Sequence, residues 1–269
     1  MGGESTTGTA PRRDDGTGAG PAGGRIGRRL SGLVVALGLL LFLGGFAWAA
    51  VVYRPYMVPT SSMAPTIDRG ARVLAQRVDG DEVRRGDVVV FRDRTWAQDA
   101  PVIKRVVAVG GDTVSCCKQG RLTVNGRQID EPYLKGGTAG AGFPEVRVPQ
   151  GRLFLLGDER RGSLDSTAHL TDAAEGTVSR DAVSARVDAV VWPMNGMLER
   201  PAGFEALGPL SRPGPLRTMA LMIVSGAVLV LAGAAYGPVA GLLGSLRARA
   251  RTAGTARTAG TGTGSAGVR

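Results

Sequence analysis

Two adjacent serines and a methionine, flanked by prolines, lie in the middle of VPTSSMAPTI, residues 58–67. A serine becomes a nucleophile only when a general base lies within hydrogen-bond reach and donors are aimed at the oxyanion that develops. The chemistry open to this stretch is therefore acyl transfer, provided that the rest of the chain supplies a base and the donors.

The chain contains few side chains that could serve as the base. It has one histidine, His169, and a lone histidine is more commonly a surface or structural residue than a catalytic one. Three lysines are present, of which Lys118 and Lys135 lie in polar loops next to glycines, where we expect them to be solvated. Lys104 lies instead within the β-branched run PVIKRVVAV, residues 101–109.

Strand alternation would place Lys104 on the same face as Val102 and Val106. If that face is buried, desolvation lowers the pKa of the lysine and lets it accept a proton near neutral pH. If the face is solvated, Lys104 is an ordinary surface charge. The strand pattern leaves both possibilities open, because Arg105 on the other face has neighbours of the same kind.

Two apolar runs flank the region that contains these residues. The run 33–52 has no charged residue and reaches the ~20 residues that a helix needs to cross ~30 Å of hydrocarbon. It is longer than the ~7–15 residues of a signal-peptide core, although its Ala-Trp-Ala triplet at 47–49 would supply a cleavage site. A second charge-free run, 218–246, contains Pro238, so we expect the span to end near Tyr236 and the remainder to be a broken or interfacial continuation.

The arginines predict how these two spans are oriented. Arginines cluster before the first span and after the second, so the positive-inside rule places both ends of the chain in the cytoplasm and the middle outside. Much of the net charge of +10 lies in these ends, where topology and anionic lipid explain it better than binding to nucleic acid does. We therefore expect a multi-pass protein of the cell membrane whose partners include the lipid bilayer and no nucleic acid.

Between the spans the pattern changes to short β-branched runs separated by turn signals, with no long amphipathic helix. This pattern predicts a mainly β protein whose antiparallel, barrel-like extracytoplasmic domain is anchored by two transmembrane helices. The strands are expected at 71–78, 86–92, 101–109, 120–126, 145–158 and 185–192, with short helices at 79–85 and 179–185. The expected organisation is a disordered cytoplasmic tail (1–32), a transmembrane helix (33–53), the β catalytic domain (54–199), a linker (200–215), a transmembrane helix (216–237) and a cytoplasmic basic tail (238–269).

The two cysteines, Cys116 and Cys117, are neighbours. Because the chain has one histidine, no Cys/His zinc site can be built, and we expect neither a metal nor another cofactor. A disulfide between adjacent residues would be strained, so the pattern favours two thiols on opposite faces of a strand or an intermolecular contact. An extracytoplasmic setting would nevertheless permit oxidation, and the sequence does not decide.

Five motifs follow one another in a fixed order: PTSSMAPT, GDVVVF, VIKRVVAVGGD, VNGRQIDEPYL and GDERRGSLDS. Together they resemble type I signal peptidases, serine proteases that cut signal peptides from exported proteins, over nearly all of residues 53–194. The resemblance implies that Ser62 is the nucleophile and Lys104 the general base. It also implies that the backbone N–H of Ser62 and the hydroxyl of Thr60, where serine is also common, form the oxyanion hole.

The last motif departs from the family pattern, which usually reads GDNRDNSxDSR. By resemblance, Ser163 would hydrogen-bond the lysine and Asp165 would buttress the site through ionic contacts. The usual arginine partner of that aspartate is replaced by Thr167, so Arg160 or Arg161 could substitute for it. The other departures are Glu159, Arg161 and Gly162.

The resemblance also implies the substrate and its binding site. Signal peptides of exported preproteins, delivered by Sec or Tat machinery, would be cut after a small-x-small (A-x-A) site through an acyl-enzyme. Shallow apolar pockets would accept the small residues, while an extended substrate strand pairs beside Ser62. By the family pattern these pockets would be lined by Tyr56, Val58, Pro59, Met63, Ile67 and Ile103, each of which could equally be a core residue.

Two other interpretations compete with this one. A hydrolase triad would use Ser62 or Ser163 with His169 and Asp165, but it needs a buried histidine, and STAHLTDAAEGT has the composition of a polar loop. A degenerate, non-catalytic membrane-tethered β module would account for the altered last motif. The retention of serine and lysine at the matching positions argues against such a module.

Overall fold

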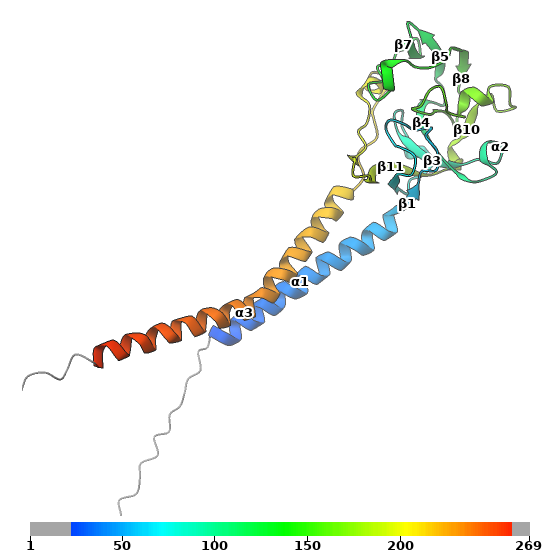
Figure 1. The fold of residues 1–269 in the computed structure, drawn as a ribbon. Helices are drawn as coiled ribbons and strands as arrows, with labels where there is room; N and C mark the ends of the chain where they lie inside the picture. Colours follow the sequence, from blue (N-terminus) through cyan, green and yellow to red (C-terminus); the bar gives the residue numbers. More distant parts are fainter. Residues whose placement is uncertain (1–22, 260–269) are drawn as a thin grey trace, which may run out of the picture. The chain divides into compact units, whose positions relative to one another are not determined.

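The chain between the two apolar runs folds into two antiparallel sheets (Figure 1). The structure, a computed structural model, describes residues 23–259, and their contacts divide the chain into two units. One unit is 44–222, which holds both sheets and all the candidate site residues; the other combines the described parts of 1–43 and 223–269. The mainly β, antiparallel fold expected for the middle of the chain is confirmed.

The larger sheet carries the residues of the central motifs. Its order is β1-β2-β11-β3-β4-β9-β10, and β12 pairs with β11. β4 is an inner strand between β3 and β9, and its register sets Lys104 opposite Val89 of β3. The strands are β1 (Tyr53–Met57), β2 (Arg72–Gln76), β3 (Val88–Arg92), β4 (Pro101–Val109), β9 (Arg152–Leu156), β10 (Thr177–Ser179), β11 (Val183–Trp192) and β12 (Gly196–Met197).

The smaller sheet has the order β7-β6-β5-β8 and shares a hydrophobic core with one face of the larger sheet. Its strands are β5 (Thr113–Lys118), β6 (Arg121–Val124), β7 (Arg127–Gln128) and β8 (Phe143–Arg147). Within residues 53–215 the helices are all short, and both expected at 79–85 and 179–185 are present as 3₁₀ turns. They are η1 (Gly80–Glu82), α2 (Arg94–Ala97), η2 (Lys135–Gly137), η3 (Ser166–His169), η4 (Arg180–Ala182) and η5 (Ala202–Leu207).

The inner strands are buried on both faces. Residues 88–91 of β3 and 103–108 of β4 are all buried, and the apolar side chains on the two faces belong to different core clusters. A strand covered on both sides has a continuous apolar run rather than an alternating one, which is why these two strands were evident in the sequence.

The single run expected at 145–158 is two strands, β8 and β9, because Pro149 and Gly151 turn the chain between them. β1 and β5 were not predicted, nor were the short strands β7, β10 and β12. The structure also joins Cys116 and Cys117 in β5 by a disulfide, so the preference for two thiols was wrong. The two sulfur atoms lie against the backbone carbonyls of residues 139 and 140.

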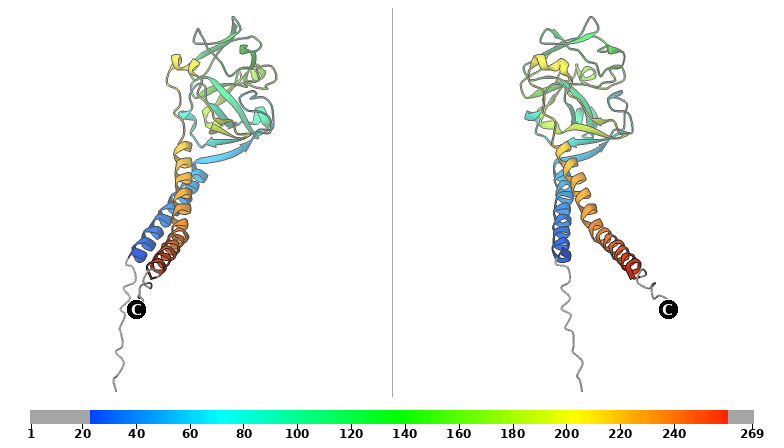
Figure 2. Two further views of the ribbon diagram at one scale, coloured as in Figure 1. Left: turned by 60° about the vertical axis from the view of Figure 1, so that its left-hand side comes forward. Right: turned by 90° about the vertical axis from the view of Figure 1, so that its left-hand side faces the viewer.

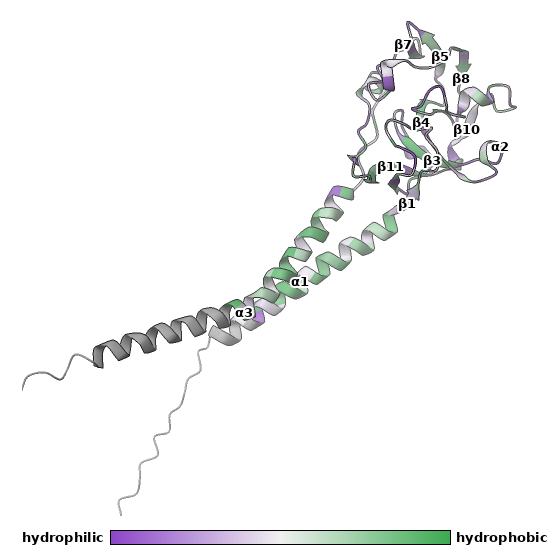
Figure 3. Cartoon of the chain, viewed as in Figure 1, coloured by the Kyte–Doolittle hydropathy of each residue, from purple (hydrophilic) through white to green (hydrophobic). Residues whose placement is uncertain are grey.

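Two described helices are long and apolar enough to cross a membrane, α1 (Gly23–Val52) over Arg29–Val52 and α3 (Leu216–Ala259) over Leu216–Tyr236 (Figure 3). In the helical unit they pack closely, since a Cβ on Gly38 would collide with Gly226 and Val230, and Ser31 Oγ donates to Gly233 O at 2.8 Å. Small residues permit this approach of two backbones.

α3 does not break after Tyr236 as expected, but continues through Pro238 to Ala259 (Figure 2). A proline removes one backbone hydrogen bond from a helix, and the alanine, leucine and arginine that follow favour helix. The expected tail 238–269 is therefore helical as far as Ala259. The expected disordered tail 1–32 is helical from Gly23 onward, as the start of α1. The expected tail segments 1–22 and 260–269 lie outside the described residues.

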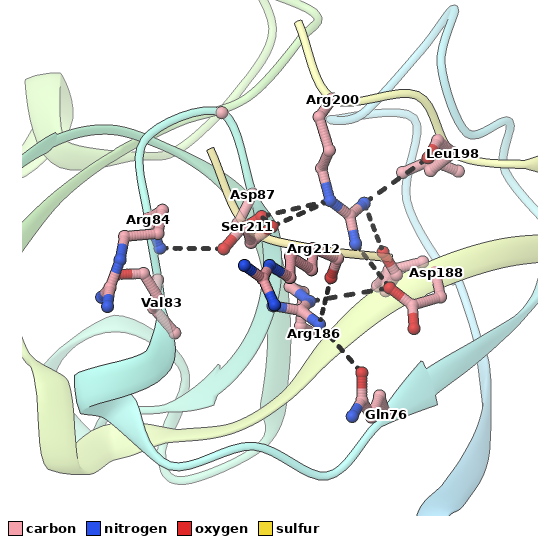
Figure 4. Close-up of polar contacts among 12 residues, drawn as sticks. Gln76, Val83, Arg84, Asp87, Arg186, Asp188, Leu198, Arg200, Ser211 and Arg212 are labelled. Atoms are coloured by element: carbon pink, nitrogen blue, oxygen red, sulfur yellow. Dashed lines mark hydrogen bonds and ion pairs between the residues drawn. The ribbon is translucent and has the colours of Figure 1, made fainter. Parts of the chain in front are cut away.

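The expected linker 200–215 is a packed part of the β unit (Figure 4). Phe204 is fully buried in the core beside the smaller sheet. Arg200 donates to Asp188 Oδ1 at 2.5 Å and lies 3.4 Å from Asp87 Oδ1, while Ser211 Oγ makes a short hydrogen bond to the same Asp87 oxygen. The four prolines of this segment thus belong to an ordered strap, and the boundary at 199 was wrong.

Candidate active site

Ser62 stands on a short loop that closes on itself after β1. Val58 N donates to Ala71 O at 2.9 Å and Gly70 N donates to Val58 O at 2.7 Å, which ties the two ends of the loop together. Met63 and Ile67 are fully buried in the core and anchor the loop from within. Burial of these two apolar side chains on either side of the turn leaves the Ser62 hydroxyl on the outer side.

Lys104 of β4 lies directly at this hydroxyl. Its side chain is 3% exposed, and its Nζ donates to Ser62 Oγ at 2.7 Å. The sequence could not tell whether Lys104 or Arg105 faces the core. Both are buried, because β4 is covered on its two faces, and Arg105 forms a bidentate ion pair with Asp158.

Burial lowers the pKa of Lys104 to about 8, and the negative charges of Asp165 and Asp158 partly oppose that shift. An ammonium removed from water is less stable relative to the neutral amine, so the amine is available at a mildly basic pH. A pKa near the working pH, together with a 2.7 Å contact to a serine hydroxyl, is the arrangement that proton abstraction from the serine requires.

Thr60 supplies a hydroxyl next to the same atom. Its Oγ1 lies 3.2 Å from Ser62 Oγ, on the exposed side of the loop. A hydroxyl in this position can donate to an oxygen of a substrate carbonyl attacked by Ser62. The loop geometry therefore agrees with the oxyanion role that the resemblance implies for Thr60.

The loop after β9 presses against the backbone of the nucleophile. Glu159 N donates to Ser62 O at 3.1 Å, and a Cβ on Gly157 would collide with that carbonyl oxygen and with the Ser163 hydroxyl. Ser163 Oγ is buried and has no hydrogen-bond partner among the described residues. The structure thus brings Ser163 beside the serine loop without showing the expected hydrogen bond to the lysine.

Asp165 is buried and holds the loop through hydrogen bonds rather than through an arginine. Its Oδ2 accepts from Gly157 N at 2.9 Å, and its Oδ1 accepts from the backbone N and the hydroxyl of Thr167. Arg160 pairs with Glu131 instead, and Arg161 is exposed. The expectation that Arg160 or Arg161 replaces the missing partner was wrong, because the smaller Thr167 caps the carboxylate directly.

A cavity of about 360 Å³ opens at Ser62 and Lys104. Four of the six expected pocket residues line it, namely Tyr56, Val58, Pro59 and Ile103. Met63 and Ile67 do not, because both point into the core beneath the serine loop. The cavity is also lined by residues that the sequence did not single out, among them Met57, Trp96, Ala97, Ala100, Pro101 and Leu164.

His169 takes no part in this arrangement. Its Nδ1 lies 2.7 Å from Asp172 Oδ2, and its ring is stacked on Trp96 at a centroid distance of 4.4 Å. The position of a base at Ser62 is held by Lys104. These contacts argue against the Ser-His-Asp triad. Among the described residues, no group of three or more Cys, His, Asp and Glu side chains is placed to hold a metal ion.

The chain matches a known protein family over most of its described length. Residues 30–192 match the family model for signal peptidase, peptidase S26. The chain belongs to this family. The matched segment includes Thr60, Ser62, Lys104, Ser163 and Asp165, and so covers all the expected site residues.

The relatives found carry the same name. Signal peptidase I of Mycobacterium tuberculosis is 33% identical, over 53% of this chain and 66% of its own length. The chain thus spans just under two thirds of this relative. Signal peptidase I U of Bacillus subtilis is 29% identical, over 63% of this chain and 92% of its own. A crystal structure of a signal peptidase I from Enterococcus faecalis is 25% identical with a TM-score of 0.31, over 43% of this chain and 96% of that one.

Proposed function

We propose that this member of the signal peptidase family is a membrane-bound serine endopeptidase that removes N-terminal signal peptides from exported preproteins. The observation that carries the proposal is the 2.7 Å contact between Ser62 Oγ and the amine of a buried lysine whose pKa burial lowers to about 8. A serine with an activated base at the floor of an apolar cavity is suited to acyl transfer.

In the proposed mechanism, neutral Lys104 takes the proton of the Ser62 hydroxyl as the serine oxygen attacks the carbonyl carbon of the last small residue of the signal peptide. The Thr60 hydroxyl and the Ser62 N–H stabilise the oxyanion. Protonated Lys104 then gives its proton to the leaving amine, and the signal peptide stays on Ser62 as an ester. A water molecule then passes a proton to Lys104 and attacks the ester, and Lys104 returns that proton to Ser62 Oγ as the signal peptide leaves.

The cavity supports a preference for small residues before the cut. Val58, Pro59 and Ile103 line it close to Ser62, so shallow apolar pockets would hold alanine side chains and leave little room for larger ones. An extended peptide beside β1 and β4 would present alternate side chains to such pockets. The substrate requirement proposed here is therefore a small-x-small site such as A-x-A.

Two apolar helices support a place in the membrane. Ser62 follows the end of α1 by ten residues, which reach at most ~36 Å when extended, so the serine can work near the surface where a signal peptide emerges. We propose that both termini are cytoplasmic and that Sec or Tat export machinery supplies the substrates.

The test is cleavage of a preprotein with an A-x-A site by the detergent-solubilised wild type and three variants, Ser62→Ala, Lys104→Ala and His169→Ala. We expect cleavage by the wild type and His169→Ala and none by the other two. Activity that survives in Lys104→Ala but is lost in His169→Ala would replace the proposal by the triad. A wild type that cleaves none of several preproteins would indicate the degenerate module.

A further inference from the structure

The active-site cavity extends well beyond the part that small residues would fill. Its lining includes residues 101–104 of β4 together with Trp96, Ala97 and Ala100 from the tip of the β3–β4 hairpin. Three steps along a strand cover about 10 Å. β9 pairs only with residues 105–109 of β4, which leaves the edge of 101–104 opposite β3 without a strand partner. A peptide paired along this edge with its last small residue at Lys104 would therefore bring its fourth and fifth residues before the cut to the hairpin tip.

Part of the cavity lining is apolar and exposed to solvent. Met57 and Leu164 also line the cavity and are 68% and 78% exposed, although both are large apolar side chains. Trp96 is half-buried, packs against the core cluster that contains Phe91, and also lines the cavity. Apolar side chains held at the surface around a catalytic cavity indicate a binding surface rather than a core.

Trp96 is held in place by aromatic contacts on other elements. Phe91 of β3 packs edge-on against it at 5.3 Å, and the His169 ring stacks on it nearly parallel, at an interplanar angle of 11°. Asp172 holds the histidine through Nδ1. The single histidine of the chain thus packs against the indole of Trp96. The proposed chemistry at Ser62 does not involve this contact.

We propose that Trp96 forms a subsite for aliphatic side chains at the fourth and fifth residues before the scissile bond, with His169 as its positioning residue. The inference rests on the proposed function. A leucine side chain packed on the indole would remove apolar surface from water and so gain binding free energy, whereas a serine side chain there would gain none. Peptides with leucine at these positions should be bound more tightly than peptides with serine.

The experiment compares two peptides with the same A-x-A site that carry either Leu-Leu or Ser-Ser at the fourth and fifth positions before the cut. For the wild type we expect kcat/KM to favour the leucine peptide about tenfold, mainly through KM. Trp96→Ala should reduce that preference to about twofold or less while still cleaving the serine peptide. Trp96→Phe should restore most of it.

Matched variants separate positioning from general damage. His169→Ala should weaken the leucine preference in the same direction, and His169→Phe, which restores a flat ring behind Trp96, should recover it. Trp192→Ala removes an exposed tryptophan of β11 that does not line the cavity, and it should leave the preference unchanged.

Equal cleavage of both peptides by the wild type would overturn the subsite. Loss of kcat on both peptides in Trp96→Ala and Trp96→Phe alike would also overturn it. So would a loss of the leucine preference in Trp192→Ala as large as the loss in Trp96→Ala. A wild type that cleaves neither peptide nor any preprotein would overturn the proposed function together with this inference.

Discussion

At the level of single residues, the proposed catalysis depends on the Ser62 hydroxyl oxygen and on the two side chains next to it. Ser62 Oγ has Lys104 Nζ at 2.7 Å and Thr60 Oγ1 at 3.2 Å. One neighbour can accept a proton and the other can donate one, so their removal should have different kinetic effects.

Thr60→Val should lower kcat about 10²–10³-fold with little change in KM, because the hydroxyl would stabilise charge that develops only in the transition state. Thr60→Ser keeps the hydroxyl and should retain most of the activity. Steady-state kinetics on one A-x-A peptide measure both variants. A Thr60→Val variant with near wild-type kcat would show that Thr60 is only a turn residue.

The identity of these residues was accessible from the sequence, but their surroundings were not. Ser62 and Lys104 came from ordered motifs, while the strand pattern could not say which face of β4 was buried; the structure shows that both are. The stack of His169 on Trp96 joins residues far apart in the chain, so no local pattern could have indicated it. A tryptophan in a hairpin tip next to a predicted active strand was the one available signal.

At the scale of elements, the loop between β9 and η3 sets the position of the serine loop. Gly157→Ala would force a Cβ into the Ser62 carbonyl and the Ser163 hydroxyl, so we expect kcat to fall at least tenfold. Gly162→Ala is the matched control in the same loop, since its Cβ would meet only Glu159 Cγ at 3.4 Å. Equal activity of the two variants would contradict the proposed contact between the loops.

The strap at 200–215 should contribute strongly to stability. Arg200→Met leaves the buried carboxylates of Asp87 and Asp188 without their shared cation, so the free energy of unfolding should drop by about 3–5 kcal/mol. Arg161→Met changes an exposed arginine and should stay within about 0.5 kcal/mol of the wild type. Denaturant unfolding compares them, and similar midpoints would mean that the strap is a linker after all.

Elements were predictable where local composition decided them. β3 and β4 are continuous β-branched runs, and both appeared at the expected positions. β1 contains a proline and directly follows α1, and β5 contains the paired cysteines, so neither had a clear strand pattern. The packing of the strap could not be predicted for a different reason. Its prolines suggested a linker, whereas its burial depends on a contact with Asp87, which is distant in sequence.

At the scale of the whole molecule, charge and hydropathy make a prediction about topology. Most of the net positive charge lies at the two ends of the chain, beyond the apolar spans Arg29–Val52 and Leu216–Tyr236, because acidic residues nearly balance the basic ones between the spans. We expect protease added to intact spheroplasts to cut within residues 54–215 while epitope tags at both termini stay protected. Loss of either tag without permeabilisation would contradict the proposed orientation.

The pH dependence of peptide cleavage shows whether the reaction requires neutral Lys104 as its base. Burial lowers the pKa of this lysine to about 8, so the neutral fraction and kcat/KM should rise about tenfold per pH unit below 8 and level off above it. The midpoint should be the same in His169→Ala. A midpoint near 6.5 that disappears in His169→Ala would identify histidine as the base and contradict the account.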